Sequence, residues 1–147
     1  MKTCGTYDDV SLILRLYETR REKKLREARD WFFKSFHVKT LDDLQALCPL
    51  GSDTNAYYRM VVSYWEMAAS FVTNGVLHRE LFFESGRELL FVWVRIRDVL
   101  PAIREAHKDP KAFGNLEAVA NEYIEWWKGR SPDAYEGFVE RVSAKPK

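Results

Sequence analysis

The residue with the clearest chemical potential is Glu66, a carboxylate in the middle of the most apolar stretch of the chain. Ser63 and Ser70 stand one helical turn on either side and would share a narrow polar stripe with it. A carboxylate among apolar residues is costly unless it is paired or hydrogen-bonded. The pattern indicates a tuned acid or base, an anchor for a cationic ligand, or a structural carboxylate. We favour the structural interpretation, in which Glu66 is solvated along the stripe or pairs with one of three arginines, Arg29, Arg95 or Arg97.

A ligand site is the alternative interpretation of Glu66. Helical bundles hold small molecules in pockets between their helices, and these pockets combine aromatic side chains with a few polar groups. Such a pocket is predicted to consist of Glu66, Trp65, Trp93 and Arg97. It would make the Glu66→Gln substitution change ligand affinity more than stability.

Other familiar catalytic arrangements have no counterpart in the sequence. The three histidines are far apart, and neither Cys-x-x-Cys nor Glu-x-x-His occurs, so we expect no metal site. Glycine-rich phosphate loops and the Gly-x-Ser-x-Gly motif are also missing. Cys48 precedes Pro49 at the end of an expected helix, where the helix dipole raises the pKa of a thiol. We therefore expect no cofactor and no catalytic residue, and favour a protein that is not an enzyme.

Residues 20–30 form a basic run with six Lys or Arg against three Asp or Glu, a net charge of +3. The run could contact phosphate or an acidic partner, or it could be a solvated helix face with pairs such as Glu22 and Arg26. We favour the solvated face. The whole chain has a net charge of only +1, so we expect no nucleic-acid partner.

The elements that would position these residues are helices. Of the 147 residues, 46% are apolar and 14% aromatic, which is enough for one core without disulfides. We predict one all-α domain over residues 1–147, an irregular bundle of five to seven helices with a core of about 25–142. Residues 143–147 are predicted to be a disordered tail. Residues 89–97 alternate like a strand, but the helical period continues to Ile103, so we favour a helix.

Helix starts are marked by residues that can cap a free backbone N–H. In a capping box, the side chains of two residues three positions apart each accept a hydrogen bond from the other residue's backbone N–H. We predict capping boxes for Thr6 with Asp9, Thr40 with Asp43, and Ser85 with Glu88. Asn115 is predicted to cap a later helix.

The first expected helix is unusually long, from residue 7 to about residue 36, and its apolar positions fall into two groups. Residues 18–24 between the groups contain no candidate for burial. The first group is Val10, Ile13, Leu14 and Tyr17. A compact domain would leave this stripe uncovered, and exposed stripes of this kind usually meet another chain. The leading hypothesis is a non-enzymatic interaction module that forms a homo-oligomer or binds a protein partner.

The two cysteines are too few for a secreted disulfide framework. No signal peptide is visible, and no apolar run approaches the length of a membrane span. We therefore expect a cytoplasmic protein, although peripheral contact with a membrane stays open.

Several short motifs occur in an order that has a known counterpart: Glu27-Ala28-Arg29 before Trp31-Phe32, Tyr64-Trp65-Glu66, Gly75 with Leu77, Leu81-Phe82-Phe83, and Trp93 with Ile96. Over residues 25–105 the chain resembles a bacterial family of helical domains of unknown function. Many members of that family carry a membrane span ahead of the Glu-Ala-Arg helix, whereas residues 10–17 are too short and too charged to span. The resemblance implies that Arg29 and Glu66 matter to the domain, and it supplies no activity.

Overall fold

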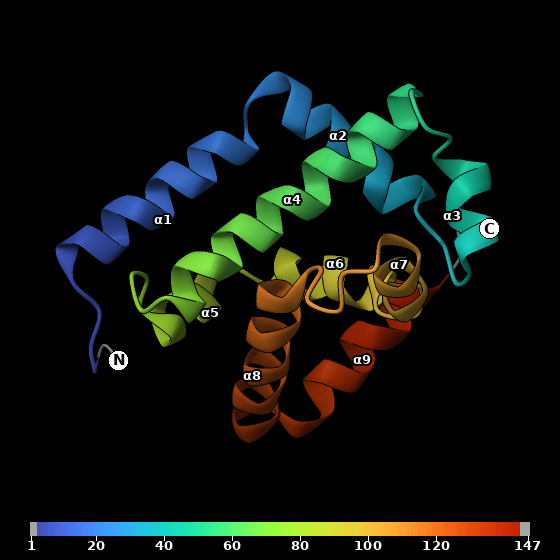
Figure 1. Ribbon diagram of the computed structural model, residues 1–147. Coiled ribbons are helices and arrows are strands. Elements are labelled where there is room, and N and C mark those ends of the chain that lie inside the picture. The colour runs from blue at the N-terminus through green and yellow to red at the C-terminus, as the bar shows by residue number, and fades with distance from the viewer. Residues whose placement is uncertain (1–2, 145–147) are drawn as a thin grey trace.

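The computed structural model describes residues 3–144, and these form helices joined by short loops, without strands (Figure 1). The nine helices of this range are α1 (Tyr7–Arg20), α2 (Lys23–Ser35), α3 (Leu41–Leu47), α4 (Asp53–Thr73), α5 (Arg79–Ser85), α6 (Glu88–Ile96), α7 (Leu100–His107), α8 (Gly114–Arg130) and α9 (Pro132–Ser143). The all-α class is confirmed. The predicted number of five to seven helices is wrong, because the expected N-terminal helix is divided into two and the segment that contains Pro101 is divided as well.

The expected long N-terminal helix is one of the divided segments. It ends as α1 at Arg20, and α2 starts after Glu22, whose carboxylate accepts a hydrogen bond from the backbone N–H of Leu25 at 3.0 Å. Hydrogen bonds from the backbone of Lys24 and Leu25 lower the pKa of Glu22. Glutamate is not among the preferred N-cap residues, so the sequence signals this break only weakly. The prediction of a long N-terminal helix is therefore wrong.

The second divided segment follows α5. Residues 89–96 are helical as predicted, but α6 ends at Ile96, and Pro101 lies in the first turn of α7. The capping boxes of Thr6 and Thr40 are confirmed. The box predicted for Ser85 is wrong, because Ser85 is the last residue of α5 and α6 begins at Glu88 without any side-chain cap.

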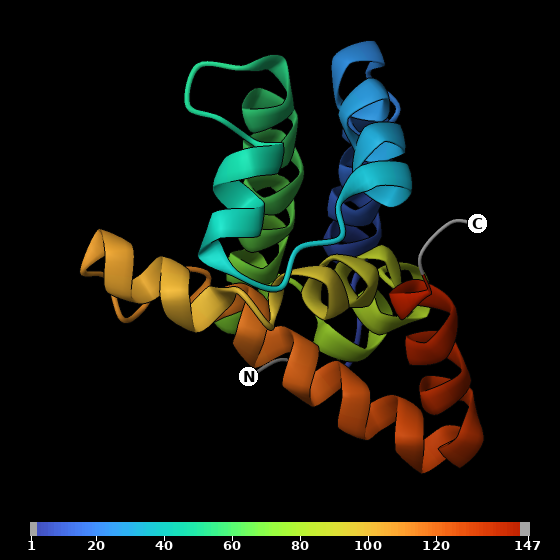
Figure 2. The ribbon, with the colours of Figure 1, turned by 90° about the vertical axis from the view of Figure 1, so that its right-hand side faces the viewer.

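The helices surround α4, which packs against α2, α6 and α8. α1 runs in the opposite direction to α4, and α2 then bends and crosses α4 (Figure 1). Figure 2 shows α2 and α4 side by side, with α8 and α9 crossing below them. The buried apolar side chains form one core cluster, and its largest fully buried member is Trp65 of α4. Helix α4 is thus central, as its nearly all-round apolar surface requires.

The last helix extends to Ser143, the first residue of the expected disordered tail, and residues 145–147 lie outside the described range. Both cysteines are free thiols. Burial raises the pKa of the Cys48 thiol to about 11, so desolvation rather than the helix dipole is the cause of this shift. Between residues 3 and 144, no helix is long and apolar enough to cross a bilayer.

Candidate functional site

Glu66 lies half-buried on α4 and caps the start of α8. One carboxylate oxygen accepts hydrogen bonds from the backbone N–H and the side-chain amide of Asn115, at 2.9 and 3.2 Å. The other oxygen accepts from the backbone N–H of Leu116 at 3.0 Å. Phe113, the residue before α8, offers no side-chain cap of its own. The cap predicted for Asn115 is therefore wrong, because a carboxylate from another helix satisfies the first turn of α8.

The other residues of the predicted pocket are distributed around the core. Trp65 is fully buried and donates its indole N–H to Glu88 at 3.0 Å. Trp93 is buried on α6, and Arg97 lies half-buried just after the end of that helix. Trp65 therefore turns towards α6, whereas its neighbour Glu66 turns towards α8. A ligand pocket shared by the four residues stays a prediction.

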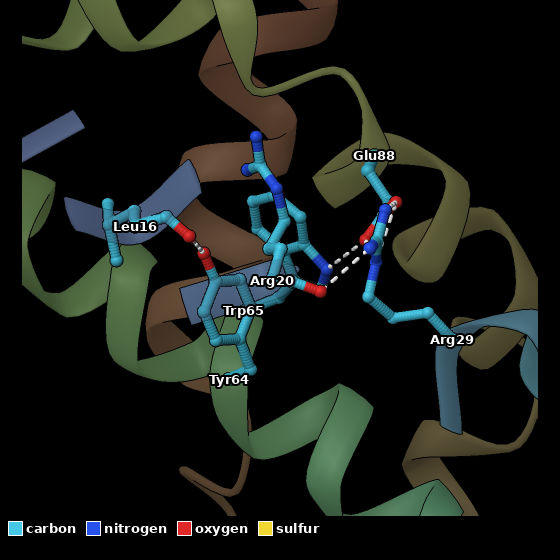
Figure 3. Close-up of polar contacts among 6 residues, drawn as sticks. All are labelled: Leu16, Arg20, Arg29, Tyr64, Trp65 and Glu88. Atoms are coloured by element: carbon cyan, nitrogen blue, oxygen red, sulfur yellow. Dashed lines mark hydrogen bonds and ion pairs between the residues drawn. The ribbon is translucent and has the colours of Figure 1, made fainter. Parts of the chain in front are cut away.

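The carboxylate of Glu88, at the start of α6, accepts hydrogen bonds from two other helices (Figure 3). Arg29 of α2 donates from Nε and Nη2 to both of its oxygens, with the shortest separation at 2.7 Å. This two-pronged geometry is the strong form of an arginine–carboxylate pair, and it raises the pKa of Arg29. With the indole of Trp65 as a third donor, Glu88 links α2, α4 and α6.

The same group of residues holds the end of α1. Arg29 donates from Nη1 to the backbone carbonyl of Arg20 at 3.0 Å. The hydroxyl of Tyr64 donates to the carbonyl of Leu16 at 2.6 Å, and burial raises the pKa of Tyr64 to about 12, so this donor stays protonated at neutral pH. α1 is thereby fixed to α2 and α4 through its own backbone carbonyls.

The outward face of α1 is apolar and exposed. Its large side chains have exposed fractions of 87% for Tyr7, 43% for Val10, 55% for Leu14 and 49% for Tyr17. Ile13, which was predicted in the same stripe, is partly buried and packs against the core. We call Tyr7, Val10, Leu14 and Tyr17 the α1 stripe.

A second feature begins where the α1 stripe ends. A cavity of about 470 Å³ opens between α1, α2 and the turn from α5 to α6. We call it the arginine cleft, because its walls include Arg20, Arg21, Arg29 and Arg87 besides Glu88 and Tyr17. An opening lined by several guanidinium groups has the chemistry to hold an anion.

The sequence indicated only parts of this arrangement. The basic run contributed Arg20, Arg21 and Arg29, but Arg87 and Glu88 were interpreted as part of a capping box. One signal could have corrected this, because a buried tryptophan N–H needs an acceptor, and Glu88 is a carboxylate within an apolar segment. Among residues 3–144, no group of three or more His, Cys, Asp or Glu side chains is placed to hold a metal ion.

A family model described as a domain of unknown function (DUF4760) matches residues 6–126. Neither the curated proteins nor the solved structures contain a match to this chain.

Proposed function

Because the chain belongs to the DUF4760 family of domains of unknown function, whose description assigns no activity, we propose a function from geometry alone. The protein is a helical interaction module, and it self-associates when the α1 stripe of one copy packs against the α1 stripe of a second copy. The observation that carries this proposal is the exposure of four large apolar side chains on one face of a firmly held helix.

The spacing of the stripe fits an antiparallel pair of α1 helices related by a two-fold axis. Such an axis would place Tyr7 beside Tyr17 of the second copy, and Val10 beside Leu14 of the second copy. The contact is self-complementary, as a two-fold interface requires, because each residue and its counterpart exchange roles.

Charge supports a second copy as the occupant. Asp8 and Arg15 are exposed and seven residues apart, so they lie two turns apart on the same flank of the stripe. This distance is too long for an ion pair within one helix, and neither side chain has an ion-pair partner within residues 3–144. In the antiparallel arrangement Asp8 of each copy meets Arg15 of the other. The two helix dipoles also oppose each other favourably.

We expect light scattering to give about twice the chain mass of 17.3 kDa for the wild-type protein. Leu14→Glu should reduce this value to the mass of one chain, because it places two like charges at the centre of the interface. Asp8→Arg and Arg15→Asp should each weaken the dimer about ten-fold, since both symmetric pairs become repulsive. The double exchange of Asp8→Arg with Arg15→Asp should restore it.

The matched control is Leu50→Glu, which introduces the same charge at an exposed leucine of another surface and should leave the dimer intact. Helical circular dichroism should be unchanged in every variant, because all the positions are exposed. A wild-type protein of single-chain mass at high concentration would contradict the proposal. Failure of the double exchange to restore association would contradict the antiparallel arrangement, and binding to lipid vesicles by a monomer would assign the stripe to a membrane surface.

We also propose that the module works in the bacterial cytoplasm. The bacterial setting rests on the family resemblance described above. A reducing compartment is supported by two unpaired cysteines, one of which, Cys4, is exposed. We expect alkylation inside living cells, followed by mass spectrometry, to find Cys4 as a free thiol. A mixed disulfide or an intermolecular bridge at Cys4 would contradict this assignment.

A further inference from the structure

We propose that the arginine cleft is a binding site for a small molecule that carries phosphate groups. The proposal goes beyond self-association and does not depend on it. It rests first on an excess of charge, because the walls of the cleft carry four arginines and one carboxylate. Glu88 is already engaged by Arg29 and by the indole of Trp65. Three positive charges therefore remain without a carboxylate.

These three guanidinium groups are held in place by aromatic rings. Arg20 lies 5.2 Å from the ring centre of Trp65, and Arg87 lies 4.3 Å from that of Trp127. Arg21 lies 5.6 Å from the ring centre of Tyr17. Within residues 3–144, none of the three has an acidic partner. Arg20 and Arg87 also contact the hydroxyls of Tyr64 and Tyr123, and each guanidinium has further N–H donors. Stacking on aromatic rings restrains an arginine while these further donors stay available, so the cleft is organised for an anion before the anion arrives.

The backbone at the floor of the cleft adds to this preference. The cleft is bordered by Ser85 and by the first turn of α6, which no side chain caps. The start of a helix carries a partial positive charge, which favours phosphate, while the N–H groups of Leu89 and Leu90 already donate to the carbonyls of Gly86 and Arg87.

Size and charge together identify the class of ligand. A cavity of about 470 Å³ lies within the range of small-molecule sites and far exceeds the needs of a single inorganic ion. Arginine forks match the oxygens of phosphate, and an excess of three positive charges suits a diphosphate or two phosphate esters on one molecule.

The test is calorimetric titration of the full chain with inorganic diphosphate. We expect saturable binding that weakens as sodium chloride is added, because the contacts are ionic. Arg21→Gln and Arg87→Gln should each reduce the affinity about ten-fold or more, since each removes a charge-assisted contact from an exposed side chain. Arg87→Lys should bind with intermediate affinity, because it keeps the charge and loses the fork.

Arg141→Gln is the matched control, since Arg141 is an exposed arginine of α9 outside the cleft, and it should bind like the wild type. Leu14→Glu should also bind normally, which separates this proposal from self-association. Absence of binding at about 1 mM diphosphate, or equal losses in Arg141→Gln and Arg87→Gln, would overturn the site. Equal affinity for citrate would overturn the preference for phosphate. Binding to phosphoinositide vesicles without binding of free diphosphate would replace the small molecule by a lipid surface.

Discussion

Replacing Arg95 by alanine should lower the free energy of unfolding by about 3–5 kcal/mol, because two strong charge-assisted hydrogen bonds and their packing are lost together. Arg95 lies on α6 and is only 8% exposed. It donates to the backbone carbonyl of Phe36 at 2.6 Å, just beyond the end of α2, and to that of Val142 in α9 at 2.8 Å. One side chain thus joins three helices.

The cost of losing Arg95 is high because its acceptors are the free carbonyl ends of helices. The last carbonyl groups of a helix have no partner within that helix and carry the negative end of its dipole. Burial lowers the pKa of Arg95 to about 10, so at neutral pH it is still a cation. Its guanidinium also lies 4.5 Å from the ring centre of Phe91. Alanine would leave buried carbonyls without a hydrogen-bond donor and would remove the contact between the guanidinium and the ring of Phe91.

Urea unfolding followed by circular dichroism measures this effect. The slope of the free energy of unfolding against urea concentration should be unchanged, which would show that only stability has changed. Arg97→Ala is the matched control two residues later, where the arginine is half-buried and outside the core. We expect the free energy of unfolding of this control to lie within about 0.5 kcal/mol of the wild-type value. The stability of Arg95→Lys should lie between those of Arg95→Ala and Arg97→Ala, since lysine keeps the charge but reaches fewer carbonyls. Equal urea midpoints for Arg95→Ala and Arg97→Ala would contradict the structural role.

What could be predicted from the sequence was chiefly local. The caps of Thr6 and Thr40 involve partners three residues away, so the pattern alone contains both halves of the interaction. The box of Ser85 has the same pattern, yet it does not form because Glu88 is engaged by Arg29, 59 residues away. A sequence pattern cannot weigh a local partner against a distant one, and here the distant arginine and a buried tryptophan offer the stronger contacts.

The break after α1 explains why the site was only partly predicted. In a continuous helix Arg20 and Arg29 would have lain about two and a half turns apart and on opposite sides, and a solvated basic helix was the favoured interpretation. The turn at Arg21 and Glu22 instead directs Arg29 back to the carbonyl of Arg20 and opens the arginine cleft beside it. The exposed stripe was predicted more successfully, because apolar periodicity is read within one helix. Its Val10, Leu14 and Tyr17 are exposed, whereas Ile13 turns to the core.

The second large effect concerns Glu66. We expect Glu66→Gln to lower the free energy of unfolding by about 2 kcal/mol and Glu66→Ala by about 3 kcal/mol, as removal of a charged helix cap with three hydrogen bonds would. The glutamine amide would keep one acceptor oxygen, but its NH₂ group would face the N–H groups of Asn115 or Leu116. Two donors would then oppose each other, and the start of α8 would lose its negative charge. The measurement is again urea unfolding.

Glu125→Gln provides the comparison, because Glu125 is an exposed carboxylate within α8 itself and away from its start. Its effect should stay within about 0.5 kcal/mol of the wild type. The comparison decides whether Glu66 is a structural carboxylate or part of a ligand site, the two interpretations that its sequence position allows. A structural cap loses stability when its charge is removed and leaves diphosphate binding at the arginine cleft unchanged, since its contacts are with α8. If Glu66→Gln unfolds at the wild-type urea concentration, the cap is dispensable, and a carboxylate retained in an apolar helix would again require a ligand to explain it.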